Sequence, residues 1–400
     1  MKKYNQLLIK DNNKKQVYQM IEDIPGVSRA QIAERMKLSK TTVSALVDEL
    51  MQEGYVVDEG ACTSSRQGRR PNSLTVNSHA NSVIVMNWHK DSLEIALVDP
   101  AMNVTMCKEY DMKGAKDVLA QLGRYFEAFK GSQCVDLRIM GVCVIVPGMI
   151  DQKQDKIVSV VLPPGDQGEH RISRLRSVLA GCPLAILNDT ACFAYAENAF
   201  GKLDSENYIY ININDGVGAA LIHGGHLLGG ASGMATQFGH VSVDRNGYPC
   251  PCGNKGCLEN QIGELALPRL FKEFGVKAEK KEGEKLLFKD LAAMAEAGDT
   301  AALRLMSAMA EDLAYALCNA VSLLHPEVII VGGIGRKLGG RFLETLKEKI
   351  GHMGFRQFVS DVEVVYTRQG EASVARGAAK YYIDQYFRFN DTDPSGLFCG

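Results

Sequence analysis

The sequence has no apolar stretch long enough to span a bilayer, which argues against an integral membrane protein. Behind the short basic start, residues 1–6, it lacks the sustained apolar segment and small-residue cleavage site of a signal peptide. Proline is scarce, at 12 residues, and no low-complexity tract is present, so the composition is that of a globular protein. We therefore expect a cytoplasmic protein with no membrane partner.

A disulfide framework is not evident either. The chain has 11 cysteines, an odd number, and most stand singly inside apolar segments: Cys143, Cys182, Cys192 and Cys318. Such thiols fit a reducing compartment better than an oxidising one. One cluster, near residue 250, is the exception.

At 400 residues the chain is too long for one ordinary core, and two or three domains are expected. The net charge of −2 conceals an asymmetry, because residues 1–75 carry 12 Lys+Arg against 9 Asp+Glu, a net of +3, and the remainder carries a net of −5. A positive excess at one end is compatible with a nucleic-acid partner, although it does not establish one.

Three regions follow one another along the chain. Residues 14–57 have helical periodicity and residues 58–77 are polar. From about residue 81, short β-type runs alternate with helical patterns, which indicates an α/β architecture. The runs at 139–146 and 328–331 are apolar throughout, as expected of strands buried on both faces. The predicted strands are 83–87, 93–98, 141–146, 184–187, 208–213 and 328–331.

The first region has the signals of a helix–turn–helix unit. Ser28 and Gln31 form a predicted capping box before one helix, and Ser39 can cap a second. In the second helix, apolar residues at helical spacing form one face: Val43, Leu46, Val47, Leu50 and Met51. Beyond the Ser39 cap, the opposite face presents side chains suited to a major-groove edge and its phosphates: Lys40, Thr41, Thr42 and Ser44.

A wing is predicted to follow the two helices. Residues 54–57 and 73–76 are expected to pair as strands around a loop that carries Arg66, Arg69 and Arg70. Such a loop can reach phosphates or a narrow minor groove. Any small helical bundle has similar helix spacing, so the helix pair alone leaves DNA binding open, and the arginine-bearing hairpin favours it.

The cysteine cluster consists of Cys250, Cys252 and Cys257, with His240 ten residues upstream. Three thiolates at this spacing can converge with an imidazole on one point, and one His with three Cys is a closed tetrahedral zinc set. The alternatives are unpaired thiols or a Cys250–Cys252 disulfide, which would be strained. Because four protein ligands leave no open position, the predicted zinc is structural rather than catalytic.

The residues around this cluster resemble a known signature. Gly239-His240 followed by Cys250-Pro-Cys252-Gly-x-x-Gly-Cys257-Leu-Glu259 is similar to that of the ROK family (repressors, open reading frames, kinases). The supporting motifs are Asn188-Asp189-Thr190-Ala191 with Ala196-Glu197, Pro147-Gly148-Met149-Ile150-Asp151, the run 325–333, and Gly68-Arg69-Arg70-Pro71, which is typical of the repressor branch. The resemblance covers nearly the whole chain.

The resemblance implies an α/β fold in which a winged helix–turn–helix domain precedes a two-lobed, actin-like (ribonuclease H-like) domain with a sugar in its cleft. It also implies homo-oligomers, usually dimers or tetramers. Carried over position by position, it gives these sugar-binding residues: Asn188, Asp189, Gln237, His240 and Glu259. Gln237 stands where the family usually has Glu, and because an amide donates as well as accepts, the hydroxyl pattern it recognises can differ.

Physical arguments bear on the same residues. Carboxylates and amides bind paired sugar hydroxyls, and Asp189 follows the predicted strand 184–187 at the end where α/β ligand sites occur. The alternative for Asn188 and Asp189 is a cap for a helix over 191–200. His240 could use one ring nitrogen for zinc and the other for a sugar.

Kinases of the family carry Asp-x-Gly-Gly-Thr in the first hairpin, where glycines let backbone amides approach ATP phosphates. Here Asn87 replaces the aspartate, His89 and Lys90 replace the glycines, and Asp91 replaces the threonine. These changes fill the phosphate space and remove the magnesium-associated carboxylate, so we predict no catalytic residues and no enzyme activity. In the alternative, a sugar kinase fused to a DNA-binding domain, Asp189 would be the base.

The sequence therefore predicts a sugar-responsive DNA-binding regulator that represses carbohydrate-utilisation genes. The expected domains are a winged helix–turn–helix at 1–76, a sugar-binding domain at 77–390 with a zinc knuckle at 240–257, and a poorly ordered tail at 391–400. The expected partners are operator DNA, a monosaccharide or sugar-phosphate effector, and a second copy of the chain. A zinc-stabilised scaffold without ligand is a third interpretation, which the polar residues near the knuckle disfavour. The identity of the sugar, the direction of its effect and the operator stay open.

Overall fold

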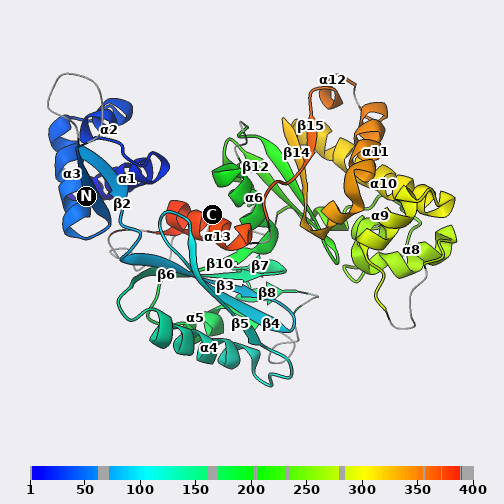
Figure 1. The fold of residues 1–400 in the computed structure, drawn as a ribbon, viewed down its shortest axis with the longest axis horizontal. Coiled ribbons are helices and arrows are strands. Elements are labelled where there is room, and N and C mark those ends of the chain that lie inside the picture. The colour runs from blue at the N-terminus through cyan, green and yellow to red at the C-terminus, as the bar shows by residue number, and fades with distance from the viewer. Residues whose placement is uncertain are drawn as a thin grey trace. The chain divides into compact units, whose positions relative to one another are not determined.

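The computed structural model describes residues 2–61, 72–159, 162, 170–201, 203, 205–229, 235–278, 284–354, 356–370, 372–387 and 389. The chain forms two compact units: Met1–Asp189 with Ala375–Gly400 is unit 1, and Thr190–Val374 is unit 2. It leaves unit 1 at the start of helix α6 (Asp189–Phe200) and returns within helix α13 (Ser373–Tyr381) (Figure 1).

The N-terminal part of unit 1 is a winged helix–turn–helix. Its elements are α1 (Lys2–Asp23), α2 (Arg29–Met36), α3 (Lys40–Gln52), β1 (Val56–Ala61) and β2 (Asn72–Val76). The predicted capping box is present, because Gln31 Oε1 accepts from the Ser28 amide at 2.9 Å while Ser28 Oγ accepts from the Gln31 amide. Ser39 caps α3 by accepting from the Thr42 amide at 3.0 Å. β1 and β2 pair antiparallel and form the wing.

The main sheet of unit 1 has five strands in the order β10-β6-β3-β4-β5. Their bounds are β3 (Asn81–Trp88), β4 (Ser92–Val98), β5 (Val104–Asp111), β6 (Arg138–Val146) and β10 (Leu184–Asn188). β3, β4 and β5 are antiparallel, whereas β6 and β10 run parallel to β3. A small second sheet contains β7 (Met149–Asp151), β8 (Lys156–Val158) and β9 (His170–Arg171).

The two faces of the unit 1 sheet pack against different helices. One face forms a core with α4 (Val118–Gln133) and α5 (Ile172–Val178), where Trp88 and Phe126 are fully buried. The other face packs against α13 and the π-helical turn η6 (Tyr382–Tyr386) that continues it, since Cys143 Sγ lies 3.6 Å from the Ala378 carbonyl oxygen. Figure 1 shows α4 and α5 on one side of the sheet and α13 on the other.

Unit 2 repeats the strand order of unit 1. Its sheet runs β13-β12-β11-β14-β15, so in both units three antiparallel strands are followed by two parallel ones on the other side of the first strand. The strands are β11 (Tyr208–Ile213), β12 (Val217–His223), β13 (His226–Leu227), β14 (Val328–Gly332) and β15 (Glu363–Tyr366). This duplicated order is that of the actin-like, ribonuclease H-like class, which confirms the predicted fold class.

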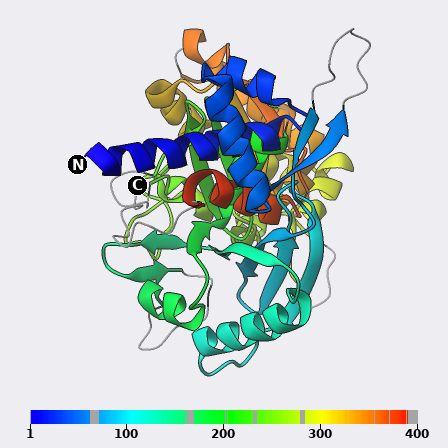
Figure 2. The same cartoon turned by 90° about the vertical axis from the view of Figure 1, so that its left-hand side faces the viewer.

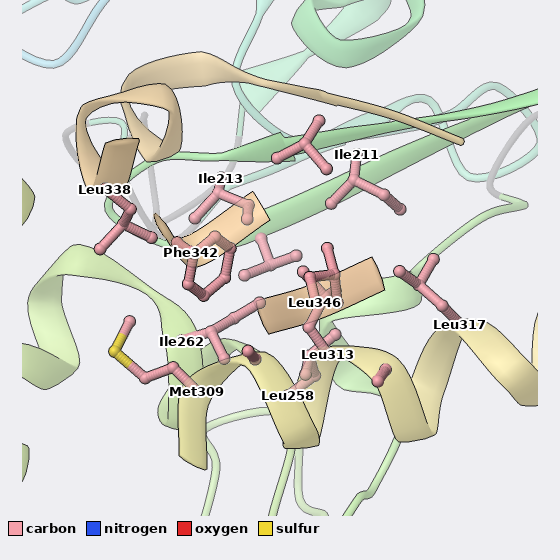
Figure 3. Close-up of a cluster of buried hydrophobic side chains, with 14 of the residues drawn as sticks. Ile211, Ile213, Leu258, Ile262, Met309, Leu313, Leu317, Leu338, Phe342 and Leu346 are labelled. Atoms are coloured by element: carbon pink, nitrogen blue, oxygen red, sulfur yellow. The ribbon is translucent and has the colours of Figure 1, made fainter. Parts of the chain in front are cut away.

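A large hydrophobic core lies on one face of the unit 2 sheet. Figure 3 shows Ile211 and Ile213 of β11 facing Leu313 and Leu317 of the long helix α10. Tyr208 and Tyr210 belong to a smaller core that includes Ala194 of α6. The remaining helices of unit 2 are α7 (Glu259–Ile262), α8 (Leu267–Phe274), α9 (Phe288–Glu296), α10 (Thr300–Leu324), α11 (Gly339–His352) and α12 (Arg356–Val359), with 3₁₀ turns η3 (Phe238–His240), η4 (Glu264–Ala266) and η5 (Gly333–Leu338).

All six predicted strands are present, with ends that differ by at most three residues. The first wing strand is longer than predicted and begins later, since β1 covers Val56–Ala61 rather than 54–57. The first helix also begins well before the predicted residue 14. Within the described part of the chain, no helix combines the length and apolarity needed to cross a membrane.

Candidate metal centre and adjoining polar residues

The cysteine cluster lies on a short loop that folds back on itself between η3 and α7. Two isolated β-bridges, Ser242 with Cys257 and Pro249 with Lys255, bring its two arms together. At its tip the Cys250 amide donates to the Asn254 carbonyl oxygen at 2.8 Å. These backbone contacts hold the two arms of the loop together independently of any ion.

Gly256 lets the two arms approach closely. Its φ is +62°, and a Cβ at this position would lie 1.7 Å from the Asp244 carbonyl oxygen. Only a residue without a side chain fits such an approach and such a backbone conformation.

The four predicted ligands converge. One donor atom from each of His240, Cys250, Cys252 and Cys257 lies within 4.8 Å of every other. Cys250 Sγ is 3.6 Å from His240 Nδ1, and Cys252 Sγ is 3.6 Å from Cys257 Sγ. A tetrahedral zinc ion with bonds of about 2.0–2.3 Å separates its ligand atoms by roughly 3.5–3.8 Å. The thiols are too far apart for a disulfide, which needs about 2.05 Å.

The donor set needs a cation to ionise fully. Burial, with the neighbouring thiols, raises the pKa of Cys257 to about 12, and burial also raises the pKa of Cys250. A hydrogen bond from the Asn254 amide lowers the pKa of the exposed Cys252 thiol. Since only thiolates bind metal strongly, a divalent ion among these sulfurs would supply the charge that stabilises them. The residues therefore fit a closed structural site.

The cluster is joined directly to the core of unit 2. Leu258, next to the ligand Cys257, and Ile262 of α7 are fully buried. Figure 3 shows both side chains among those of α10, including Met309 and Leu313. The ligand loop is consequently held by a rigid hydrophobic contact on its C-terminal side.

Glu259 adjoins the metal cluster. Its Oε1 lies 3.2 Å from His240 Nδ1 and 3.2 Å from Cys250 Sγ. His240 thus turns Nδ1 toward the thiols, and its second ring nitrogen lies on the other side of the imidazole. His240 and Glu259 are each partly exposed, at 33% and 22% of the side chain, so both can contact a solute.

The other predicted sugar residues have different surroundings. Gln237 is exposed and immediately precedes η3, so it lies in unit 2 near His240 in the chain. Asn188 ends β10, and its Nδ2 donates to the Gly148 carbonyl oxygen at 2.9 Å. Asp189 begins α6 and is the last residue of unit 1. The helix starts earlier than the predicted 191, which places Asp189 in its first turn rather than before it.

The hairpin at residues 87–91 has the predicted position. Asn87 and Trp88 end β3 and are buried, whereas His89, Lys90 and Asp91 are exposed in the turn to β4. The His89 amide donates to the Ser92 carbonyl oxygen at 2.9 Å, which closes the turn within the hairpin.

Sequence reasoning missed one residue that links two turns of unit 2, Asn214. Its Oδ1 accepts from the Ile334 amide at 2.9 Å, and its Nδ2 donates to Asn212 Oδ1 at 3.1 Å. It thereby joins the two glycine-rich turns of unit 2, at Gly216 and Gly333. Lys285 forms an ion pair with Asp215 in the turn at Gly216, with Nζ 2.9 Å from Asp215 Oδ1.

The predicted DNA-contacting residues fall into two groups. Lys40, Thr41 and Thr42 are exposed at the start of α3, Ser44 is partly exposed, and the Ser39 hydroxyl is occupied by the cap. The apolar face is buried as predicted, except that Met51 is only partly buried. The wing arginines Arg66, Arg69 and Arg70 lie outside the described residues, as does the predicted tail.

A winged helix–turn–helix followed by a duplicated ribonuclease H-like domain defines a class of two-part proteins. A family model described as "ROK family" matches residues 88–385, and one described as "Winged helix-turn-helix DNA-binding" matches residues 10–57. The chain belongs to the ROK family.

Known proteins resemble this chain over nearly its full length. The "Xylose repressor" of Caldicellulosiruptor bescii is 29% identical over 399 residues, which cover 96% of this chain and 98% of that protein. The solved structure of a "ROK family transcriptional regulator, homolog of E.coli MLC protein" superposes with a TM-score of 0.80 at 24% identity, over 94% of this chain and 96% of that one. A ROK hexokinase from Thermus thermophilus gives 0.62 at 22% identity, over 74% and 96%. The two structures show a shared fold.

Proposed function

We propose that this protein is a sugar-responsive DNA-binding transcriptional repressor with a structural zinc ion. One observation carries the proposal: an exposed, polar start of α3 in a winged helix–turn–helix belongs to the same chain as a ROK domain. Two relatives that each align with 96% of the chain are named xylose repressors, which supports the same assignment.

The N-terminal residues of α3 would contact operator DNA. Lys40 would pair with a phosphate, and Thr41, Thr42 and Ser44 would donate to base edges or phosphates in the major groove. Ser39 would act mainly by holding the helix start, since its hydroxyl already accepts from the Thr42 amide. Arg66, Arg69 and Arg70 of the wing loop would add phosphate or minor-groove contacts.

The effector would be a monosaccharide or a sugar phosphate. We propose that it is bound by Asn188, Asp189, Gln237, His240 and Glu259. The zinc, held by His240, Cys250, Cys252 and Cys257, would keep His240 and Glu259 in position and take no part in chemistry. A bound sugar changes DNA affinity only by as much as it favours one arrangement of the protein over another. In a homodimer or homotetramer, that arrangement would set the spacing of the recognition helices.

Two features disfavour the kinase alternative. His89, Lys90 and Asp91 fill the hairpin turn where kinases of the family have small residues. In unit 2 the Ile334 amide already donates to Asn214, so a backbone donor beside Gly333 is taken up within the protein. Phosphoryl transfer depends on free donors around the phosphates, which these features reduce.

The test uses full-length protein and genomic DNA fragments. Fragments selected by the protein should include a site that it binds with nanomolar affinity, and one sugar among D-xylose, D-glucose and N-acetylglucosamine, free or phosphorylated, should change that affinity by about 5- to 150-fold. If the protein selects no fragment, or if its affinity responds to none of these sugars, the proposal is contradicted. ATP consumption above about one turnover per second with any of them would favour the kinase instead.

A further inference from the structure

A cluster of charged groups that neither the zinc site nor the DNA-contacting face uses surrounds Lys380, near the end of α13. Its Nζ lies 3.1 Å from Glu22 Oε2, 3.2 Å from Asp23 Oδ1 and 3.0 Å from Asp384 Oδ1. The ammonium group donates to Asp23 and Asp384, and it forms an ion pair with Glu22. Two of these carboxylates come from the last residues of α1, more than 350 positions away in the chain.

The cluster is largely shielded from water. The side chains of Lys380, Glu22 and Asp384 are 11%, 5% and 14% exposed, whereas that of Asp23, at the edge of the cluster, is 60% exposed. Burying charges is costly, and a well-packed apolar contact would often be as stable, so such a cluster is poor evidence for stability alone. Removing one partner, however, leaves charges buried without compensation, which makes the geometry of the contact specific.

Around Lys380 the C-terminal segment is fixed to the sheet of unit 1. Tyr382, two residues on, donates from its hydroxyl to the Met140 carbonyl oxygen of β6 at 2.8 Å. Its ring covers Gly141, where a Cβ would lie 2.0 Å from the Tyr382 hydroxyl oxygen. The position of Lys380 is therefore set by the sheet.

On the other side, the cluster is linked to the recognition helix. Lys14 of α1 lies 2.6 Å from Glu53, which directly follows α3, and Lys10 lies 2.6 Å from Glu49. Tyr18 of α1 is fully buried and packs against Phe387 and Phe389 with ring centroids 6.4 and 5.6 Å apart. Figure 2 shows α1 beside the red C-terminal helices. α1 thus joins α3 to the C-terminal segment.

The first two residues of α13 belong to unit 2, whereas the rest of the helix belongs to unit 1. The helix begins at Ser373, and the division between the units falls between Val374 and Ala375. A displacement of unit 2 would therefore act on the first residues of the same helix whose last turn binds α1.

We propose that Lys380 is a positioning residue that holds the winged helix–turn–helix on the rest of unit 1. Through this contact, a conformational change caused by effector binding would be transmitted from α13 through α1 to the recognition helix α3. The transmission rests on the proposed function, whereas the docking contact stands on the structure of unit 1. The Glu22 side chain is 5% exposed and pairs with Lys380, so displacing Lys380 would leave it without a compensating charge.

The first experiment measures amide hydrogen exchange of the full-length protein without DNA or sugar. Lys380→Met should speed exchange by about tenfold or more in peptides covering both 14–23 and 378–387, because local opening no longer breaks the ion pairs. Asp384→Asn, a milder variant that keeps Lys380, should act in the same direction. The matched control is Lys349→Met, which removes an interhelical pair with Glu311 at 2.5 Å in unit 2 and should leave both peptides unchanged. If amide exchange in both peptides were unchanged in Lys380→Met and in Asp384→Asn, the docking contact would be overturned.

The second experiment compares operator affinity with and without each of D-xylose, D-glucose and N-acetylglucosamine. In the Lys380→Met and Asp384→Asn proteins the ratio of the two affinities should fall toward one, while Lys380→Arg and Lys349→Met should keep the wild-type ratio. A wild-type ratio in Lys380→Met would overturn the transmission. If the wild-type protein itself binds no operator or ignores every sugar, the proposed function fails together with the transmission, and the exchange data still decide the docking contact.

Discussion

The backbone conformation of the metal loop, the segment from His240 to Cys257, depends on Gly256. Both Gly253 and Gly256 have positive φ, at +94° and +62°, but only a Cβ at Gly256 meets the backbone, whereas nothing lies within 4 Å of one at Gly253. Gly253→Ala should cost about 1–3 kcal/mol through backbone strain alone. Gly256→Ala should cost more and should also lower the zinc content, because Asp244 must move. Elemental analysis and urea unfolding of the two variants check this, and equal losses would contradict it.

The convergence of His240 with the three cysteines could be predicted from the sequence because its geometry is local. His240 and Cys257 are 17 residues apart, and glycines between them restrict how the loop can close. The sequence carried no comparable signal for Asn214 or Lys380. Their partners lie 120 and 357 positions away, and only the packing of strands and helices brings them together.

At the scale of single elements, α3 presents the surface that would read DNA. Lys40→Ala should weaken operator binding and reduce the salt dependence of log K by about 0.9, the value for one lost phosphate contact. Fluorescence anisotropy titrations at several salt concentrations measure this slope. Lys347→Ala, at an exposed ion pair in unit 2, serves as the control and should leave the slope unchanged. An unaltered slope in Lys40→Ala would remove this residue from the phosphate-contacting set.

The metal loop should act on sugar binding through its position. Removing zinc with a chelator should weaken binding of the responsive sugar, because His240 and Glu259 then lose the constraint that the four ligands supply. The measurement is the sugar-induced shift in Tm for native, stripped and zinc-restored protein. Restoration should recover the shift, and an identical shift in stripped protein would show that the loop has no such role.

Strand prediction succeeded for apolar runs that are fully buried, and it failed for an exposed edge strand and for a strand rich in small residues. β6 and β14 contain apolar runs buried on both faces, and the uninterrupted apolar sequence of each run predicts this burial. β5 was not predicted, because it pairs only with β4 and nearly all its residues are exposed, so Lys108 and Glu109 interrupt any apolar pattern. β12 was also missed, since Gly218, Ala219 and Ala220 give it little β-type signal.

After the winged helix–turn–helix, the chain forms a duplicated fold, and residues 375–387 return to complete its first unit. The main sheet of unit 1 is formed by β3, β4, β5, β6 and β10, but the helix on one of its faces comes from residues after 372. No local pattern reveals that α13 returns to unit 1 rather than closing unit 2. This return places the C-terminal segment against α1, and it makes the stability of unit 1 depend on a contact between the two ends of the chain.

That contact should give unit 1 a pH-dependent stability. Burial, opposed by the charge of Lys380, raises the pKa of Glu22 from 4.5 to about 7, and Asp384 and Asp23 contribute in the same direction. Tyr18 and Lys380 are the other titratable groups that face it, and their pKa values are held above their ordinary range. Neither of these changes charge between pH 5 and 8.

The direction follows from proton binding. Between pH 4.5 and 7 the folded protein retains a proton on Glu22 that the unfolded chain has released, so the free energy of unfolding falls as pH rises through this window. Glu22→Gln cannot titrate. Relative to the wild type, it should therefore gain on the order of 1–3 kcal/mol between pH 5 and pH 8. Urea unfolding at both pH values measures this gain. The exposed variant Glu344→Gln should give a curve parallel to the wild type, and parallel curves for Glu22→Gln as well would mean that Glu22 stays ionised in the folded protein.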